Sequence, residues 1–167
     1  MNMKRVLLIF LIAVAIVASI SAVSAGLFDG LFGQAQDNVV ELDNITFNTT
    51  NVTKFKLYNS SSEEGLDAKW YVDENESGYD VQIYNFSALD DSDYGEWVNE
   101  YLDYFGNLSS QNIDGVVVYD ITADVGEHIG DARYVASFED KDSKTIIDIS
   151  TPYPDETAKI ISTLKLK

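Results

Sequence analysis

One sequence pattern in this chain points most clearly to a chemical modification. It is asparagine followed two positions later by serine or threonine. Seven Asn-x-Ser/Thr sequons are present, and none has Pro in the middle position. Their acceptor residues are Asn44, Asn48, Asn51, Asn59, Asn75, Asn85 and Asn107. The eleven Asn residues of the chain would form roughly one or two sequons by chance. The excess predicts a glycoprotein exposed on the outside of a cell.

The same letters would be present in an unmodified chain, so the host decides the outcome. An archaeon or a eukaryote would modify several of these sites, whereas an ordinary bacterium would leave most of them bare. No sequon begins after Asn107. If glycans coat the first part of the domain, the last third is left free to contact a partner or the cell envelope.

Acidic side chains gather just before the first expected helix, at Asp90, Asp91, Asp93 and Glu96. Their hard oxygen atoms could bind Ca²⁺, but the spacing lacks the distal bidentate Glu of an EF-hand loop. Acidic residues are also what caps a helix and complements its dipole. We favour the helix-cap interpretation and expect no metal or cofactor.

A second acidic stretch comprises Asp120, Asp124, Glu127 and Asp131, and a solvated loop explains it more simply than a cation site does. The single histidine, His128, has no second imidazole or serine motif with which to form a catalytic set. A pair of carboxylates for glycoside hydrolysis cannot be located from sequence, because its defining property is a separation in space. No catalytic residue is therefore assigned.

Aromatic residues are concentrated in the middle of the chain. Trp97 and Tyr101 fall on the apolar stripe of an expected helix, so we place them in the core. Tyr71 and Tyr84 have the opposite parity to the expected inward residues of their strands. They would form either an outward row that binds polysaccharide or protein, or a second packed face beneath the helix; we favour the packed face.

The N-terminus has the pattern of an export signal. Lys4 and Arg5 precede an apolar run over residues 6–18 and a small-residue tail over 19–25. Cleavage after Ala25 would leave Gly26 as the mature N-terminus. The alternative is an uncleaved anchor, since residues 6–25 are just long enough to span a bilayer core of about 30 Å. Both predict an extracellular or cell-surface domain, attached to a membrane only through this segment if it is retained.

Composition excludes several classes of function. The chain has no cysteine, so thiol catalysis and thiolate metal sites are absent and the fold must be held by packing. Its net charge of −17 repels nucleic acid and anionic lipid. Such a surface suits cations, basic proteins or simple solubility.

Periodicity predicts an α+β domain over residues 44–167, preceded by a flexible leader over 26–43. About six antiparallel strands and two helices are expected, in the order strands, helix, strands, helix. The first strand segment is 44–48, which continues extended over 52–58; the others are 68–72, 79–86, 116–122, 133–139 and 145–150. Segment 116–122 is apolar enough to be a central strand covered on both faces. Residues 59–67 are expected to form a Ser/Glu loop.

Strand parity predicts which side chains face the core, and capping residues predict where the helices begin and end. Ile45 and Phe47 face the core, so Asn44 and Asn48 should share the solvent face; Phe55 and Leu57 are also expected to face inward. A capping box of Asp93 and Glu96 starts the first helix, and Gly106 is expected to end it with positive φ. The second helix starts at Pro154, with Asp155 and Glu156 in its first turn.

The segments 131–139, 145–150 and 155–165 together resemble the closing part of Mog1/PsbP-like domains, in which two strands lead into a final helix. The chain as a whole is similar to small secreted proteins of methanogenic archaea. The resemblance implies a binding or assembly role and carries no catalytic residues, and fold alone does not give function.

We therefore expect a non-catalytic, exported, acidic glycoprotein that acts as a cell-surface or envelope interaction module. Its partner would be a protein or an envelope polysaccharide, and not nucleic acid. The alternative is a carboxylate-based extracellular hydrolase of wall or matrix sugars, which a convergent pair of buried acids in a cleft would favour.

Overall fold

A computed structural model describes residues 37–63, 65–122 and 132–167. The expected export signal with its cleavage site at Ala25 and Gly26, the leader up to residue 36, and His128 with Asp124, Glu127 and Asp131 lie outside these residues. The described chain is α+β, as expected, but its strands form two antiparallel sheets where one was predicted.

The larger sheet has seven strands. In spatial order they are β3 (Phe55–Glu63), β4 (Leu66–Asp73), β5 (Asp80–Asn85), β9 (Thr145–Thr151), β8 (Tyr134–Asp140), β7 (Val116–Asp120) and β6 (Ser109–Ile113). Every residue of β9 is buried, so β9 is the strand covered on both faces. The prediction that 116–122 would hold this place is wrong, because β7 lies next to the edge and Val117 is 43% exposed.

The smaller sheet consists of β1 (Asn38–Leu42), β2 (Ile45–Thr49) and β10 (Lys165–Leu166), with β2 in the middle. β1 falls in the segment that was expected to be part of the leader. Its alternation explains the difference: Val40 and Leu42 are buried while Val39 and Glu41 are exposed. The predicted inward parity of Ile45 and Phe47 is confirmed, since both are buried.

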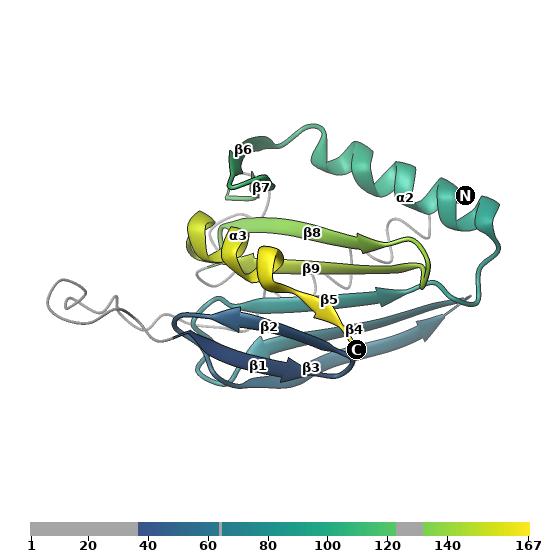
Figure 1. Ribbon diagram of the computed structural model, residues 1–167. Helices are drawn as coiled ribbons and strands as arrows, with labels where there is room; N and C mark the ends of the chain where they lie inside the picture. The colour runs from purple at the N-terminus through teal and green to yellow at the C-terminus, as the bar shows by residue number, and fades with distance from the viewer. Residues whose placement is uncertain (1–36, 64, 123–131) are drawn as a thin grey trace, which may run out of the picture.

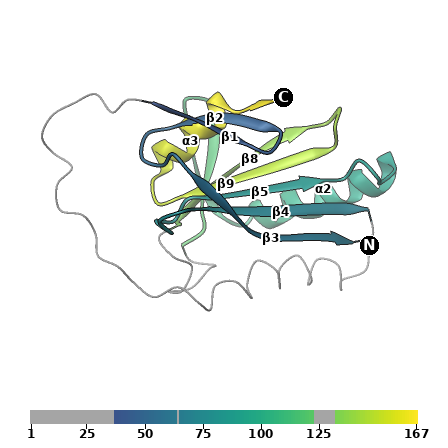
Figure 2. The same ribbon diagram turned by 90° about the horizontal axis from the view of Figure 1, so that it is seen from below.

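Helices and the small sheet cover the large sheet on its two faces (Figures 1 and 2). On one face lie α3 (Pro154–Thr163) and the small sheet, and the core between them contains Phe47, Ile147 and Ile160. On the other face lies α2 (Asp91–Phe105), whose Trp97 packs with Phe86 and Ile146. The side chains of β9 thus alternate between two separate cores.

Three strand predictions require correction. Residues 59–63 and 66–67 belong to the paired strands of the β3–β4 hairpin, where a loop was expected. Leu57 is 53% exposed, because β3 is the edge strand and only Phe55, near its start, reaches the core at Phe47. β6 was not expected, since its sequence Ser-Ser-Gln-Asn-Ile carries almost no apolar signal.

The start and end of α2 also differ from the capping prediction. The N-cap is Asp90, whose Oδ1 accepts hydrogen bonds from the backbone N–H groups of Ser92 and Asp93, both at 2.9 Å. Gly106 has φ −59°, so it continues the right-handed turn and needs no glycine-specific conformation. α3 begins as expected, with Pro154 in its first turn and with Asp155 and Glu156 beside it.

This geometry makes the cap testable. We expect Asp90→Ala to lower the free energy of unfolding by about 1 kcal/mol, because two backbone donors lose their acceptor. Asp90→Asn should retain most of the stability, since its amide oxygen can accept the same bonds. Asp93→Ala, which removes no cap, serves as the matched control in urea unfolding; a larger loss for Asp93→Ala than for Asp90→Ala would contradict the assignment.

Candidate functional site

Five of the seven sequon asparagines are exposed, and each lies in a turn, a loop or an edge strand. They are Asn44 in the β1–β2 turn, Asn51 in the loop after β2, Asn59 on edge strand β3, Asn75 in the β4–β5 turn and Asn107 after α2. Their exposure leaves them accessible to a bulky modification. At Asn51 the acceptor nitrogen, Nδ2, also donates to the hydroxyl of buried Tyr79 at 2.9 Å, so a glycan there would share this nitrogen with a contact to the core.

The other two acceptors are only partly exposed. Asn48 lies on β2 beside α3, where its backbone N–H donates to Thr163 Oγ1 at 3.0 Å. The hydroxyl of its sequon, Thr50 Oγ1, accepts from Lys159 Nζ at 2.6 Å. Asn44 and Asn48 therefore do not share a free strand face as predicted: Asn44 is in a turn, and α3 packs against β2 at Asn48. Asn85 is partly buried at the end of β5, opposite Thr145.

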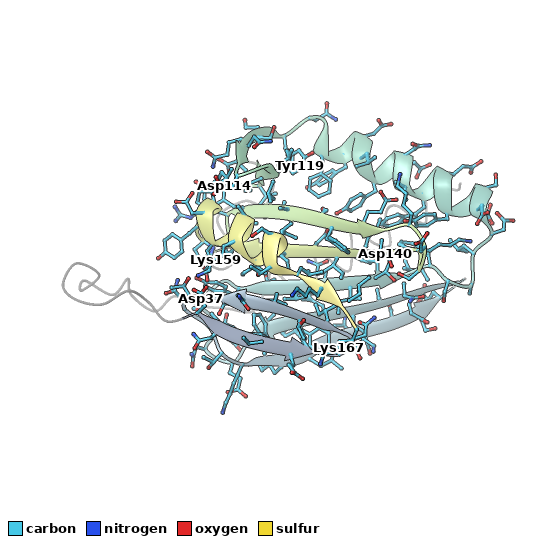
Figure 3. The ribbon with its side chains drawn as sticks, viewed as in Figure 1. Asp37, Asp114, Tyr119, Asp140, Lys159 and Lys167 are labelled. Atoms are coloured by element: carbon cyan, nitrogen blue, oxygen red, sulfur yellow. The ribbon has the colours of Figure 1, made fainter. Side chains whose placement is uncertain are left out.

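The sequon-free end of the chain forms β8, β9, α3 and β10. Its exposed features are the β8–β9 turn near Asp140 and the side chain of Tyr153, which is 57% exposed just before α3. Lys159 of α3 forms an ion pair with Asp37, and Figure 3 shows the two side chains at the same end of the molecule. An aromatic ring at a glycan-free surface is a feature common in binding sites.

A polar cluster is buried beneath α2, on the large sheet. Asp148 of β9 accepts hydrogen bonds at Oδ1 from the hydroxyl of Tyr101 on α2 and, at 2.7 Å, from Ser137 Oγ on β8. Burial away from water raises the pKa of Asp148 to about 6, and these two hydroxyl donors oppose the rise. A third hydroxyl, that of Tyr84, donates to Gln82 Oε1 nearby on β5.

Asp80 is the second acid on this face of the sheet. The cross-strand pairs Asp80–Ser150 and Gln82–Asp148 make Asp80 and Asp148 diagonal neighbours, roughly 7–8 Å apart at the backbone. Burial raises the pKa of Asp80 to about 7, and the indole of Trp70 opposes that rise. The Trp70 Nε1–H is buried, and no acceptor among the described residues lies in good hydrogen-bond geometry to it. The two carboxyls are thus adjacent, desolvated and without a cation between them in the described chain.

Sequence reasoning missed Asp80 and Asp148, although one signal was available. Asp148 stands between Ile147 and Ile149 in a strand whose other residues are all Ile, Ser or Thr. In a strand buried on both faces, an ionisable residue must have partners in the layer above. The identity of those partners, Tyr101 and Ser137, depends on how α2 crosses the sheet.

The aromatic residues form a continuous layer between α2 and the sheet. Trp97 lies 4.2 Å from Phe86 and stacks on Tyr101 at 5.1 Å between ring centroids. Tyr101 then contacts Phe105, which reaches Tyr119 of β7 at 4.8 Å; Figure 3 shows Tyr119 beneath the C-terminal end of α2. Trp97 and Tyr101, which were expected on the apolar stripe of the helix, are both part of this layer.

Tyr71 and Tyr84 do not form an outward row. Tyr84 packs beneath α2 at 5.9 Å from Trp97, as the packed-face interpretation expects. Tyr71 pairs with Val81 in the β4–β5 register and packs in the opposite core. The parity assigned to Tyr71 was wrong. In the β4–β5 register Tyr71 lies opposite Val81 and faces the same core, whereas Val72 lies opposite Asp80 on the other face.

The acidic clusters form a helix cap, an ion pair and a turn hydrogen bond where the structure describes them. Asp90 caps α2, and Asp91 forms an ion pair with Lys144 at 2.7 Å. Asp120 accepts from the Thr122 N–H at 2.9 Å. The Thr122 hydroxyl first, and this backbone N–H second, hold the pKa of Asp120 below its usual range. In residues 37–63, 65–122 and 132–167, no group of three or more potential ligands could hold a metal ion.

The chain matches no protein-family model, and no curated protein or solved structure is significantly similar to it. Among the described residues, neither helix has the length and apolar character needed to cross a membrane.

Proposed function

We propose that this protein is an exported, acidic, non-catalytic glycoprotein that contacts a protein or an envelope polysaccharide at the cell surface. The observation that carries the proposal is the distribution of sequons. Exposed acceptors occupy turns and edges formed by residues 44–107, whereas β8, β9, α3 and β10 contain none. The sequon-free region, with exposed Tyr153 beside α3, would be the contact surface.

Peptide mapping and intact-mass measurement of protein from its own host would test the modification. We expect a chain that begins at Gly26 and carries glycans at the five exposed acceptors, with much lower occupancy at Asn48 and Asn85. The reason is access: the transferase must reach the side-chain amide, and Asn48 and Asn85 are partly covered. Equal occupancy at all seven would show that folding does not restrict modification, and bare sequons throughout would refute the glycoprotein proposal.

Surface labelling would test the contact. The region 133–167 should be protected on intact cells and labelled in purified protein, while the exposed β3–β4 hairpin should label in both. Equal labelling of the two regions on cells would contradict a covered contact surface there.

A hydrolase of wall or matrix sugars is the second candidate, and the adjacent acids Asp80 and Asp148 favour it. Such catalysis uses two neighbouring carboxyls, a protonated acid with a raised pKa and an ionised carboxylate that acts as nucleophile or base. Against it, Asp148 is engaged by Tyr101 and Ser137 beneath α2, where a sugar could not reach it without displacing the helix. Polysaccharide hydrolysis by the purified protein that is lost in Asp80→Asn would establish the enzyme.

A further inference from the structure

The free edge of the large sheet is a hazard for self-association. β3 is the longest strand among the described residues, with nine residues, and its only described partner is β4 (Figure 2). Its outer edge presents unpaired backbone N–H and C=O groups, which can template pairing with another chain. A protein that keeps such an edge in solution needs some protection along it.

The usual protection by charge is weak along this strand. Residues 57–62 read Leu-Tyr-Asn-Ser-Ser-Ser and contain no charged side chain, in a chain of net charge −17. Lys56 is neutralised by Glu76 at 2.7 Å. Leu57 and Tyr58 are 53% and 36% exposed, so they offer apolar contact as well. The shift in register between Leu57 and Asn59 gives some local protection.

The sequence of the edge is also compatible with pairing to itself. A two-fold axis through Asn59 would place Leu57 opposite Ser61 and Tyr58 opposite Ser60 in an antiparallel pair. Over residues 57–61 no like charges would face each other, so the side chains along the edge itself do not oppose a symmetric contact.

We propose that Asn59 carries an N-linked glycan whose role is to prevent this edge-to-edge pairing. Asn59 is exposed and lies at the middle of β3, and Ser61 supplies the hydroxyl of its sequon. In the symmetric pair, two Asn59 side chains would attach to the backbone about 5 Å apart, which leaves no room for two glycans. The opposite edge strand, β6, is short and is preceded directly by the Asn107 sequon. This inference rests on the proposed glycoprotein nature of the chain.

The test uses glycosylated protein from its own host and three single variants. Asn59→Gln should convert the monomer to a dimer or larger species in sedimentation velocity, increasingly so with concentration. Asn75→Gln, which removes one glycan from an exposed turn, should remain monomeric like the parent protein. Asn59→Lys also removes the glycan but places two positive charges opposite each other on the axis, so it should remain monomeric.

Amide hydrogen exchange locates the contact: the Asn59→Gln dimer should protect residues 56–62 relative to the monomer. A monomeric Asn59→Gln, or association of Asn59→Lys as strong as that of Asn59→Gln, would overturn the inference. If mapping finds glycans at Asn44 and Asn75 but none at Asn59, this inference fails and the proposed function stands. If all sequons are bare, both fail.

Discussion

Replacing Trp97 with alanine should lower the free energy of unfolding by about 3–5 kcal/mol, the range for deleting a large buried aromatic side chain. Trp97 is 6% exposed and contacts the rings of Phe86, Tyr101 and Tyr84. Its removal would leave a cavity in the layer that holds α2 on the sheet. Because the helix contacts the sheet through side chains of this layer, we expect partial loss of α2 as well as lower stability.

Leu102→Ala is the matched control on the same helix, because Leu102 is 53% exposed. It should change stability by no more than about 0.5 kcal/mol. Chemical denaturation monitored by circular dichroism separates the two variants. If Trp97→Ala retained full stability but abolished binding to a sugar or protein, then Trp97 would be a recognition residue and its place in the core would be wrong.

The sequence was a reliable guide where one local pattern decided the outcome. Strict alternation placed Ile45 and Phe47 inward, and helical spacing placed Trp97 and Tyr101 on the face of α2 that packs on the sheet. Pro154 and the acids after it marked the start of α3. In each case the periodicity of the element coincides with the face that is buried.

The errors arise where the outcome depends on distant parts of the chain. β1 and β10 lie in a sheet because β2 pairs with both, and the two residues of β10 are too few to give a strand signal alone. Leu57 is exposed because its strand became the edge of the sheet, which no property of residue 57 predicts. Strand order places β9, rather than β7, at the centre.

The candidate site was hidden for the same reason. Asp80 and Asp148 are 68 positions apart and become neighbours only through the β5–β9 pairing. The exposure of the sequons was more predictable, since four of the seven acceptors lie in turns or loops, where Asn is favoured. Asn48 departs from that pattern because α3, more than a hundred residues later, packs beside it.

Asp148 should make the protein less stable as pH rises through the acid range. The folded protein retains the Asp148 proton up to about pH 6, whereas the unfolded chain releases it near its ordinary value of 3.8. Between these values the folded state binds more protons, so the free energy of unfolding falls with increasing pH. At about 1.4 kcal/mol per pKa unit, the ionised side chain costs on the order of 3 kcal/mol at pH 8.

Asp148→Asn should therefore stabilise the protein by up to about 3 kcal/mol at pH 8 and change little near pH 4. The amide oxygen can still accept from Tyr101 and Ser137, so the hydrogen bonds remain while the buried charge is removed. Asp142→Asn takes the same charge from the exposed β8–β9 turn and controls for general self-repulsion. Denaturation of all three proteins between pH 4 and pH 8 measures the slopes. A destabilised Asp148→Asn with an unchanged slope would mean that the two hydroxyls stabilise the carboxylate more than burial destabilises it, and that Asp148 is ionised in the folded protein throughout this range.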